Sequence, residues 1–213
     1  MADNYLEKRY EEVFGKGAGA RSLTPVRASL DKLLHMNRSF RGYDKSHVVH
    51  RRQMDAIVAV NPLLASGGNA QSLRFHIVTK GDESATVLKH IRMGAALPEL
   101  KLPFPGTEPE AFVVVCSTCE ETPVLDIDLG ISLQSMLLKS VDLGLGGLII
   151  RNFDREAIRD ALGLPFQVVA VLAIGKPAEK VKLVTVHKGD KLNYYREDGV
   201  HKVPKLAVED LLV

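Results

Sequence analysis

The chain has 213 residues, of which 46% are hydrophobic and 25% charged, a balance that excludes a disordered or fibrous protein. Its 28 Lys and Arg against 26 Asp and Glu give a net charge of +2, so we expect neither a nucleic acid nor a membrane as partner. Because it contains no apolar run of ~18 residues and no signal-peptide layout at its start, we expect one domain over 1–213 in the cytoplasm.

The first half of the chain predicts an arm, two helices and a strand. Residues 1–22 are polar and contain three closely spaced glycines, which indicates an N-terminal arm. Thr24 and Pro25 have the residue types of an N-cap and a first helical position, so a helix should begin there and run to about His35. A second helix is predicted over 50–64, and the alternation of apolar and polar residues over 73–79 is typical of a half-buried strand.

The second half of the chain interleaves apolar helices and strands up to residue 177. The predicted elements are a short helix at 83–92, a buried strand at 112–115, a long helix at 125–143, a strand at 148–150, a helix capped by Asp154 that ends at Gly163, and a buried strand at 168–174. This irregular order of helices and strands predicts an α+β sandwich.

A polar segment, residues 178–213, closes the chain and has little periodicity of its own. A segment of this length and polarity cannot bury itself, so it is either disordered or wrapped over another surface. Its spaced aromatic and aliphatic residues favour wrapping, and a partner subunit is the simplest surface. We therefore expect a homodimer with a C-terminal arm over 178–213.

The two cysteines, Cys116 and Cys119, have the C-x-x-C spacing of a redox dithiol. Cys116, however, continues the apolar run 111–115, which favours a buried strand end where a free cysteine acts as a small hydrophobe. No further ligands at zinc-site spacing accompany the pair, and the seven histidines are scattered. We expect no metal site.

Three short clusters have residue types that suit a ligand. Residues 38–41 contain two arginines and a serine directly after a helix; they would suit a phosphate or a flavin edge, or form an ordinary charged helix end. Residues 66–71 form a turn of glycines, amides and a hydroxyl that would admit a planar ligand, or an ordinary loop. Residues 143–147 lie between a helix and a strand, the reverse of the order in a dinucleotide-binding loop, which favours a helix C-cap.

Taken together and in this order, the clusters resemble the nitroreductase family of FMN oxidoreductases. The family's R-R-S-x-R-x-(F/Y) motif is similar to residues 37–43 (N-R-S-F-R-G-Y), and its P-S-x-x-N-x-Q-P-W-x-F segment to residues 65–75 (A-S-G-G-N-A-Q-S-L-R-F). A D-x-G-x-x-x-Q-x-x-x-L helix leading to G-L-G is matched over 128–146, and the later L-G-L-P and I-G-x-P motifs over 162–177.

The resemblance implies a fold, a cofactor and an activity. The fold would be an α-β-α sandwich with a central, mostly antiparallel sheet, and arms would be swapped between the subunits of a homodimer. The cofactor would be FMN. NAD(P)H would reduce the FMN, and the reduced FMN would then pass hydride to a small acceptor such as a nitro compound or a quinone. The alternatives are a flavin carrier or redox sensor without turnover, and a relative specialised for dehalogenation or flavin fragmentation.

The resemblance also implies the residues of the flavin site. The expected contacts are Arg38, Ser39 and Arg41 to the FMN phosphate, ribityl chain or pyrimidine edge; Ser66, Asn69 and Gln71 from the partner subunit; Gly147, Ile149, Ile150 and Arg151 along the ring near N5; and Lys205 to the phosphate. The flavin would perform the chemistry, so no catalytic side chain is expected. Arg41 would act as an electrostatic stabiliser of the charge that appears on the reduced ring.

Several departures from the family pattern bear on this site. The family's C-terminal arm usually supplies basic residues to the phosphate, and here residues 203–206 (V-P-K-L) contain one cation, Lys205. Asn37 stands where the family has its first arginine, which removes one cation from the phosphate region. Ser72 and Leu73 replace a Pro-Trp pair, and Ile150-Arg151-Asn152 replaces a small glycine-rich turn.

Overall fold

A computed structural model describes residues 29–94 and 100–213 of the chain. The N-terminal arm expected over 1–22 and the helix start expected at Thr24 and Pro25 lie outside the described residues. Within the described part, no helix is both long and apolar enough to cross a lipid bilayer.

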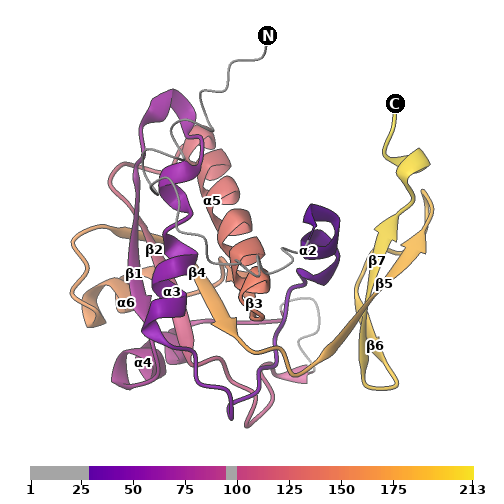
Figure 1. The fold of residues 1–213 in the computed structure, drawn as a ribbon, viewed down its shortest axis with the longest axis horizontal. Helices are drawn as coiled ribbons and strands as arrows, with labels where there is room; N and C mark the ends of the chain where they lie inside the picture. Colours follow the sequence, from indigo (N-terminus) through magenta and orange to yellow (C-terminus); the bar gives the residue numbers. More distant parts are fainter. Residues whose placement is uncertain (1–28, 95–99) are drawn as a thin grey trace, which may run out of the picture.

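A four-stranded antiparallel sheet forms the centre of the molecule (Figure 1). Its strands are β1 (Leu73–Val78), β2 (Ala111–Ser117), β3 (Gly146–Ile150) and β4 (Gln167–Gly175). The spatial order is β1-β2-β4-β3, and each neighbouring pair is antiparallel. The prediction of a central, mostly antiparallel sheet in an α+β fold is thus confirmed.

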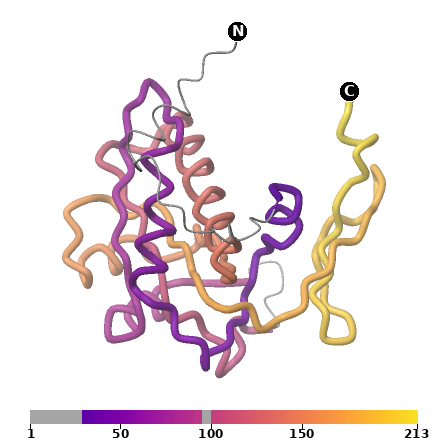
Figure 2. Tube along the Cα trace, viewed as in Figure 1, coloured from indigo at the N-terminus to yellow at the C-terminus, as the bar shows by residue number. Residues whose placement is uncertain are grey.

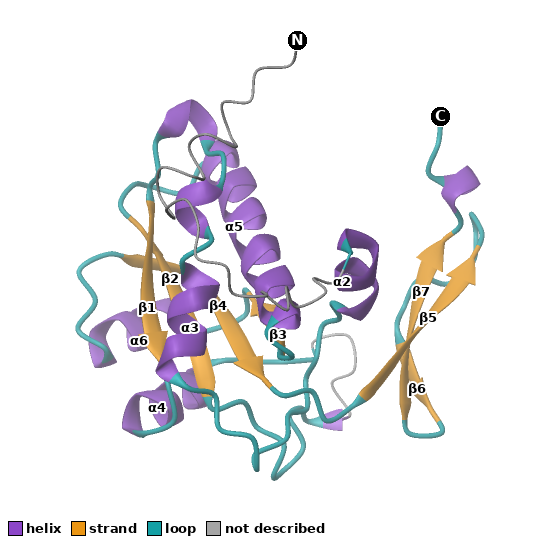
Figure 3. Cartoon of the chain, in the orientation of Figure 1, coloured by secondary structure: helices purple, strands orange, loops and turns teal. Residues whose placement is uncertain are grey.

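Helices cover both faces of this sheet and make three layers (Figure 3). Because side chains alternate along a strand, Phe112 and Val114 of β2 face one apolar cluster while Val113 and Val115 face the other. The first cluster includes residues of α4 (Asp82–His90) and α6 (Arg155–Ala161). The second cluster includes residues of α3 (Arg51–Val58) and α5 (Pro123–Asp142).

Capping residues account for where the helices begin. Thr122 caps α5 through its side chain, with Pro123 at the first helical position, and Asp154 caps α6. The helix predicted over 50–64 is shorter than expected: α3 ends at Val58, and a 3-10 turn over Asn61–Leu63 follows, with Pro62 inside it. Proline lacks the N–H group that a continuing helix would need.

Cys116 lies in β2 as expected, 3% exposed, whereas Cys119 lies beyond the strand and is exposed. Burial raises the pKa of the Cys116 thiol to about 11. A thiol that stays protonated at neutral pH is a poor nucleophile, so the geometry favours the structural interpretation of this residue.

No helix or strand was predicted over residues 178–213, yet the structure has strands there. They form a second sheet from β5 (Lys180–Val186), β6 (Tyr195–Glu197) and β7 (Val200–Leu206), in the order β5-β7-β6. Strands β5 and β7 are parallel, while β6 and β7 are antiparallel. Figure 2 shows this C-terminal sheet to one side of the sandwich, on the side where α2 (Leu30–Met36) lies.

Candidate functional site

The arginine cluster after α2 is attached to the edge of the central sheet. Ser39 forms an isolated parallel bridge with Gly147 of β3, and the backbone N–H of Phe40 donates to the Gly147 carbonyl over 3.1 Å. The Phe40 ring is buried in the core, so alternation along an extended segment leaves Ser39 and Arg41 on the opposite side. The local fold therefore turns the polar side chains of this cluster away from the core.

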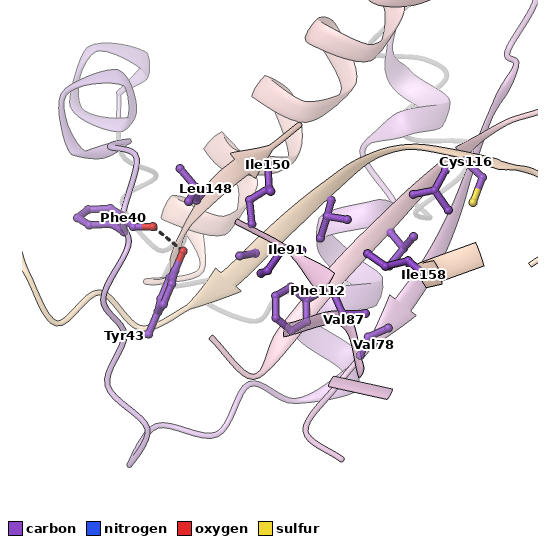
Figure 4. Close-up of a cluster of buried hydrophobic side chains, with 14 residues drawn as sticks. Phe40, Tyr43, Val78, Val87, Ile91, Phe112, Cys116, Leu148, Ile150 and Ile158 are labelled. Atoms are coloured by element: carbon purple, nitrogen blue, oxygen red, sulfur yellow. Dashed lines mark hydrogen bonds between the residues drawn. The ribbon is translucent and has the colours of Figure 1, made fainter. Parts of the chain in front are cut away.

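Glycines make this attachment possible. A Cβ atom at Gly146 would lie 2.6 Å from a Phe40 ring carbon, and one at Gly175 would lie 2.6 Å from the ring of Tyr43. The Tyr43 hydroxyl donates to the Phe40 carbonyl over 2.8 Å (Figure 4). Gly146 of the G-L-G-G run (residues 144–147) and Gly175 at the end of β4 thus have a structural role: they leave room for the Phe40 and Tyr43 rings to pack against the sheet, which fixes the arginine cluster.

A cavity of about 390 Å³, here called the cationic cavity, lies between the sandwich and the C-terminal sheet. Its lining comes from the arginine cluster, α2, α5, β3 and the C-terminal sheet: Leu34, Asn37, Arg38, Ser39, Arg41, Gln134, Leu137, Ile149, Val181, Tyr194, His201, Val203 and Lys205. Five of the residues expected at a flavin site lie here together: Arg38, Ser39, Arg41, Ile149 and Lys205. They come from distant parts of the chain, since 168 positions separate Arg38 from the end of β7 at Leu206.

Three side-chain nitrogen atoms on the lining of the cationic cavity are buried and have no hydrogen-bond partner among the described residues. They are Arg38 Nε, Arg41 Nε and His201 Nδ1. Burial also lowers the pKa of Arg38. A buried donor without a partner costs about 1–3 kcal/mol, so these groups favour an anionic ligand with several acceptor oxygens.

Arg41 is held by several neighbours. Its Nη1 donates to the Ser39 carbonyl over 3.1 Å and lies 3.5 Å from His201 Nε2. The guanidinium carbon lies 4.9 Å from the centre of the Tyr194 ring. The Arg41 backbone N–H donates to the Glu179 carboxylate, which also pairs with Arg196.

The C-terminal sheet contributes residues that the sequence analysis missed. His201, Val203 and Lys205 alternate along β7 and all line the cationic cavity. Only Lys205 was predicted there. The period of two that links it to Val203 and His201 is the signal that would have found the other two.

The second predicted cluster consists of Ser66, Asn69 and Gln71. It lies in another part of the fold and does not line the cationic cavity. Ser66 and Gln71 line a different and largely apolar cavity between α3, β1 and α5. The backbone N–H of Gly67 donates to Asp128 of α5 over 2.8 Å, and Gln71 Nε2 donates to Asn69 Oδ1 over 3.1 Å. Within one chain, the two clusters therefore lie at two separate cavities.

The four positions expected near flavin N5 also differ from one another. Ile149 is exposed and lines the cationic cavity, while Gly147 and Ile150 are buried, Ile150 within the core cluster of Figure 4. A Cβ atom at Gly147 would lie 2.4 Å from the Ala173 carbonyl oxygen, so no larger residue fits there.

Arg151 does not line the cationic cavity. It forms ion pairs with Glu121 at 3.0 Å and with Asp126 at 3.3 Å. Glu121 also pairs with Arg155, whose guanidinium holds the pKa of that carboxyl below its usual range. Arg151 is thus part of an ion-pair network at the N-terminal end of α5.

Asn37, which replaces the first arginine of the resembled motif, ends α2 and donates from Nδ2 to Gln134 Oε1 over 3.5 Å. Its Oδ1 is buried without a partner among the described residues. Over the same residues, no group of three or more His, Cys, Asp and Glu is arranged to hold a metal ion.

Comparison with known proteins gives one family and several similar structures. The sequence model described as the nitroreductase family matches residues 35–176. An FMN-dependent nitroreductase from Clostridium difficile R20291 is 21% identical with a TM-score of 0.58, over 70% of this chain and 87% of that one. A nitroreductase family protein from Clostridium novyi NT is 20% identical with a TM-score of 0.59, over 70% and 86%. The FMN and NADPH-dependent nitroreductase NfnB from Sphigopyxis sp. strain HMH is 19% identical with a TM-score of 0.59, over 71% and 89%. No curated protein sequence matches the chain.

Proposed function

Because the chain belongs to the nitroreductase family, we propose that it is an FMN-dependent oxidoreductase that uses NAD(P)H to reduce a small acceptor such as a nitro compound or a quinone. Structures with the same fold include proteins described as FMN-dependent and as FMN and NADPH-dependent nitroreductases. The observation that carries the proposal is the cationic cavity, where Arg38, Ser39, Arg41 and Lys205 meet.

The donors of the cationic cavity fit the phosphate of FMN. A phosphate monoester has a charge of about −1.5 to −2 at pH 7 and three strong acceptor oxygens. For a phosphate the cavity offers the Arg38 guanidinium, whose Nε has no partner among the described residues, the Lys205 ammonium and the Ser39 hydroxyl, and the Arg41 guanidinium remains for the ring. Charge-assisted hydrogen bonds of this kind are the strong ones in proteins. We propose that those from Arg38 and Lys205 compensate for the cation absent at Asn37.

The chain's own residues would bind and polarise the cofactor, and bound FMN would supply the hydride transfer. We assign Arg38, Ser39 and Lys205 to the phosphate. We assign Arg41 to the pyrimidine edge of the ring, where a permanent positive charge stabilises the negative charge that accumulates on reduction. Ile149, which lines the cationic cavity, would contact the ring near N5, and we propose that Gly147, Ile150 and Arg151, none of which lines the cavity, contribute there through the backbone.

A homodimer would complete the site with the second cluster. In this proposal Ser66, Asn69 and Gln71 of one subunit reach the flavin of its partner, consistent with their separation from the cationic cavity within one chain. Val124, Ile127 and Ile131 form an exposed apolar row along one face of α5, a surface that a partner would cover. The C-terminal sheet lies over the cavity of its own chain, and we propose that residues 178–213, as an arm of the single domain, also contact the partner.

The proposal is tested by the visible spectrum of the purified protein and by turnover. We expect a yellow protein with about one FMN per subunit, as the family's cofactor chemistry requires, that oxidises NADH or NADPH when a quinone or nitroarene is present. A colourless protein that gains no flavin bands on addition of FMN would reject the cofactor assignment. Bound FMN without NAD(P)H oxidation would instead identify a carrier or sensor, and a halogenated or flavin substrate consumed in the acceptor screen would identify a specialised relative.

A further inference from the structure

The C-terminal region contains two rings that the proposed function does not use: the imidazole of His201 in β7 and the phenol ring of Tyr194, one residue before β6. His201 in β7 is only 1% exposed, and its ring lies 5.0 Å from that of Tyr194, at an angle of 57°. Both side chains line the cationic cavity and both contact Arg41. Burial and the neighbouring positive charge of Arg41 both disfavour protonation of this histidine, so a neutral imidazole lies beside a permanent cation.

The contact between Arg41 and His201 fixes the tautomer of the imidazole. A guanidinium has only donors and stays protonated, so the 3.5 Å contact from Arg41 Nη1 requires His201 Nε2 to accept. The ring proton then lies on Nδ1. Burial, followed by the charge of Arg41, lowers the pKa of His201, which keeps the ring neutral at physiological pH. The other charged groups near it, Glu179 and Arg196, act in opposite directions.

Tyr194 holds the same guanidinium from its face. The Arg41 guanidinium carbon lies 4.9 Å above the Tyr194 ring centre, within the range in which a cation is attracted to an aromatic face. The Ser39 carbonyl accepts from Arg41 Nη1 over 3.1 Å. An acceptor nitrogen, an aromatic face and a carbonyl thus restrict a side chain that would otherwise have several rotatable bonds.

We propose that His201 and Tyr194 are positioning residues that hold the Arg41 guanidinium in one orientation within the cationic cavity, and through it favour the reduced over the oxidised cofactor. The proposal rests on the proposed function, because it assigns a role in the same site. It makes the C-terminal sheet part of the redox chemistry, beyond anchoring a phosphate through Lys205. An oriented charge stabilises a developing negative charge more than a mobile one does, since no reorganisation is needed.

The first experiment measures the flavin midpoint potential of the FMN-loaded protein and of its variants. His201→Phe removes the acceptor but keeps a ring of similar size, and His201→Gln keeps an acceptor near the position of Nε2. His201→Phe should lose roughly tenfold in affinity for reduced relative to oxidised FMN, the value of a hydrogen bond to a charged group, which appears as a lower potential. His201→Gln should restore most of it. His187→Phe, at an exposed position after β5, is the matched control and should leave the potential unchanged.

A double-mutant comparison separates positioning from a direct effect on the cofactor. In an Arg41→Ala background, His201→Phe should cause no further fall in potential, because there is no guanidinium left to orient. An equal fall in both backgrounds would overturn the proposal, as would no effect of His201→Phe on the wild type. If His201→Phe does not fold, Tyr194→Leu tests the same point, with Tyr194→Phe as the control that keeps the aromatic face.

The second experiment does not depend on a flavin and so distinguishes failure of this proposal from failure of the proposed function. Nitrogen NMR of the histidine rings should show His201 as the neutral Nδ1–H tautomer at pH 7, with an Nε2 shift that changes in Arg41→Ala. This result would support the Arg41–His201 contact even in a protein that binds no FMN. A charged ring or an Nε2–H tautomer would overturn the proposal even in a protein that is yellow.

Discussion

The backbone N–H of Phe40 donates to the carbonyl oxygen of Gly147 over 3.1 Å, which joins the arginine cluster to the edge strand of the central sheet. Residues 107 positions apart in the sequence are thereby held side by side, and Arg38, Ser39 and Arg41 acquire a fixed position relative to β3. The packing around this contact leads to the first prediction.

Gly147→Ala should destabilise the protein. The added Cβ atom would lie 2.4 Å from the Ala173 backbone oxygen and 2.8 Å from a Leu137 methyl group, and forced overpacking of a core costs about 1–3 kcal/mol. Urea denaturation followed by circular dichroism measures the change. Gly42→Ala is the matched control, because its Cβ atom would be in ordinary contact with Thr107 at 3.6 Å. Equal unfolding midpoints for the two variants would contradict this account of Gly147.

Ile127→Glu should convert the proposed homodimer into a monomer and weaken FMN binding. Ile127 is 63% exposed in the middle of the apolar row of α5, and a carboxylate in an apolar interface would have to be desolvated on association. Analytical ultracentrifugation gives the oligomeric state, and absorbance gives the flavin content. Val48→Glu, at an exposed apolar position outside that row, should remain dimeric. A wild-type protein that sediments as a monomer and keeps its FMN would refute the dimer.

Arg41→Ala should lower the midpoint potential of the bound flavin and slow its reduction by NAD(P)H. A charge-assisted hydrogen bond in a partly buried site contributes about 1.5–3 kcal/mol, and here it would act on the reduced ring more than on the oxidised one. Lys205→Ala should weaken FMN binding but leave the potential of FMN-saturated protein nearly unchanged. Titrations with xanthine oxidase and a reference dye measure both potentials. An unchanged potential in Arg41→Ala would show that this residue has been given the wrong role.

Cys119 should react with iodoacetamide much faster than Cys116. Cys119 is exposed, whereas Cys116 is buried in β2 with its thiol pKa raised to about 11, so little thiolate is available at pH 8. Mass spectrometry of the native protein should show one rapid modification, which Cys119→Ser abolishes. Two rapid modifications in the folded protein would favour the dithiol interpretation of the C-x-x-C pair instead.

The sandwich was largely predictable because its elements have strong local patterns. The uninterrupted apolar run that continues into Cys116 predicted β2, and Asp154 predicted the start of α6. The start of α5 was predicted two residues late, at 125, because the capping signal of Thr122-Pro123 was not used. The helix over 50–64 was overestimated because its apolar spacing continues past Val58, while Pro62 allows only a short 3-10 turn.

The C-terminal sheet was missed although its pattern is present. Polar and apolar residues alternate over 180–183, but lysines on the exposed positions of β5 made the segment look uniformly polar. Its partner strand β7 is parallel to it and reached through β6, so no short hairpin turn joins the two. His201 was overlooked for the same reason: without a strand, nothing related it to Lys205.

The candidate site was only partly predictable because its residues converge by topology. The resemblance to the family predicted four residues of the site that the fold places around one cavity: Arg38, Ser39, Arg41 and Lys205. Sequence spacing gives no indication that Arg151 pairs with Glu121 and Asp126 rather than lining that cavity, since Glu121 just before α5 and Asp126 in its first turn are 30 and 25 positions away.

The central claim is that the cationic cavity binds FMN through its phosphate, and a flavin titration tests it most directly. Flavin-free protein is titrated with FMN and with riboflavin, which lacks the phosphate, and binding is followed by quenching of flavin fluorescence. We predict that FMN binds at least about a hundredfold more tightly than riboflavin, the value of two charge-assisted hydrogen bonds. The double variant Arg38→Ala/Lys205→Ala should bind both flavins equally weakly, whereas Lys202→Ala, on the same strand but off the cavity lining, should resemble the wild type. Equal affinity of the wild-type protein for FMN and riboflavin would contradict the account.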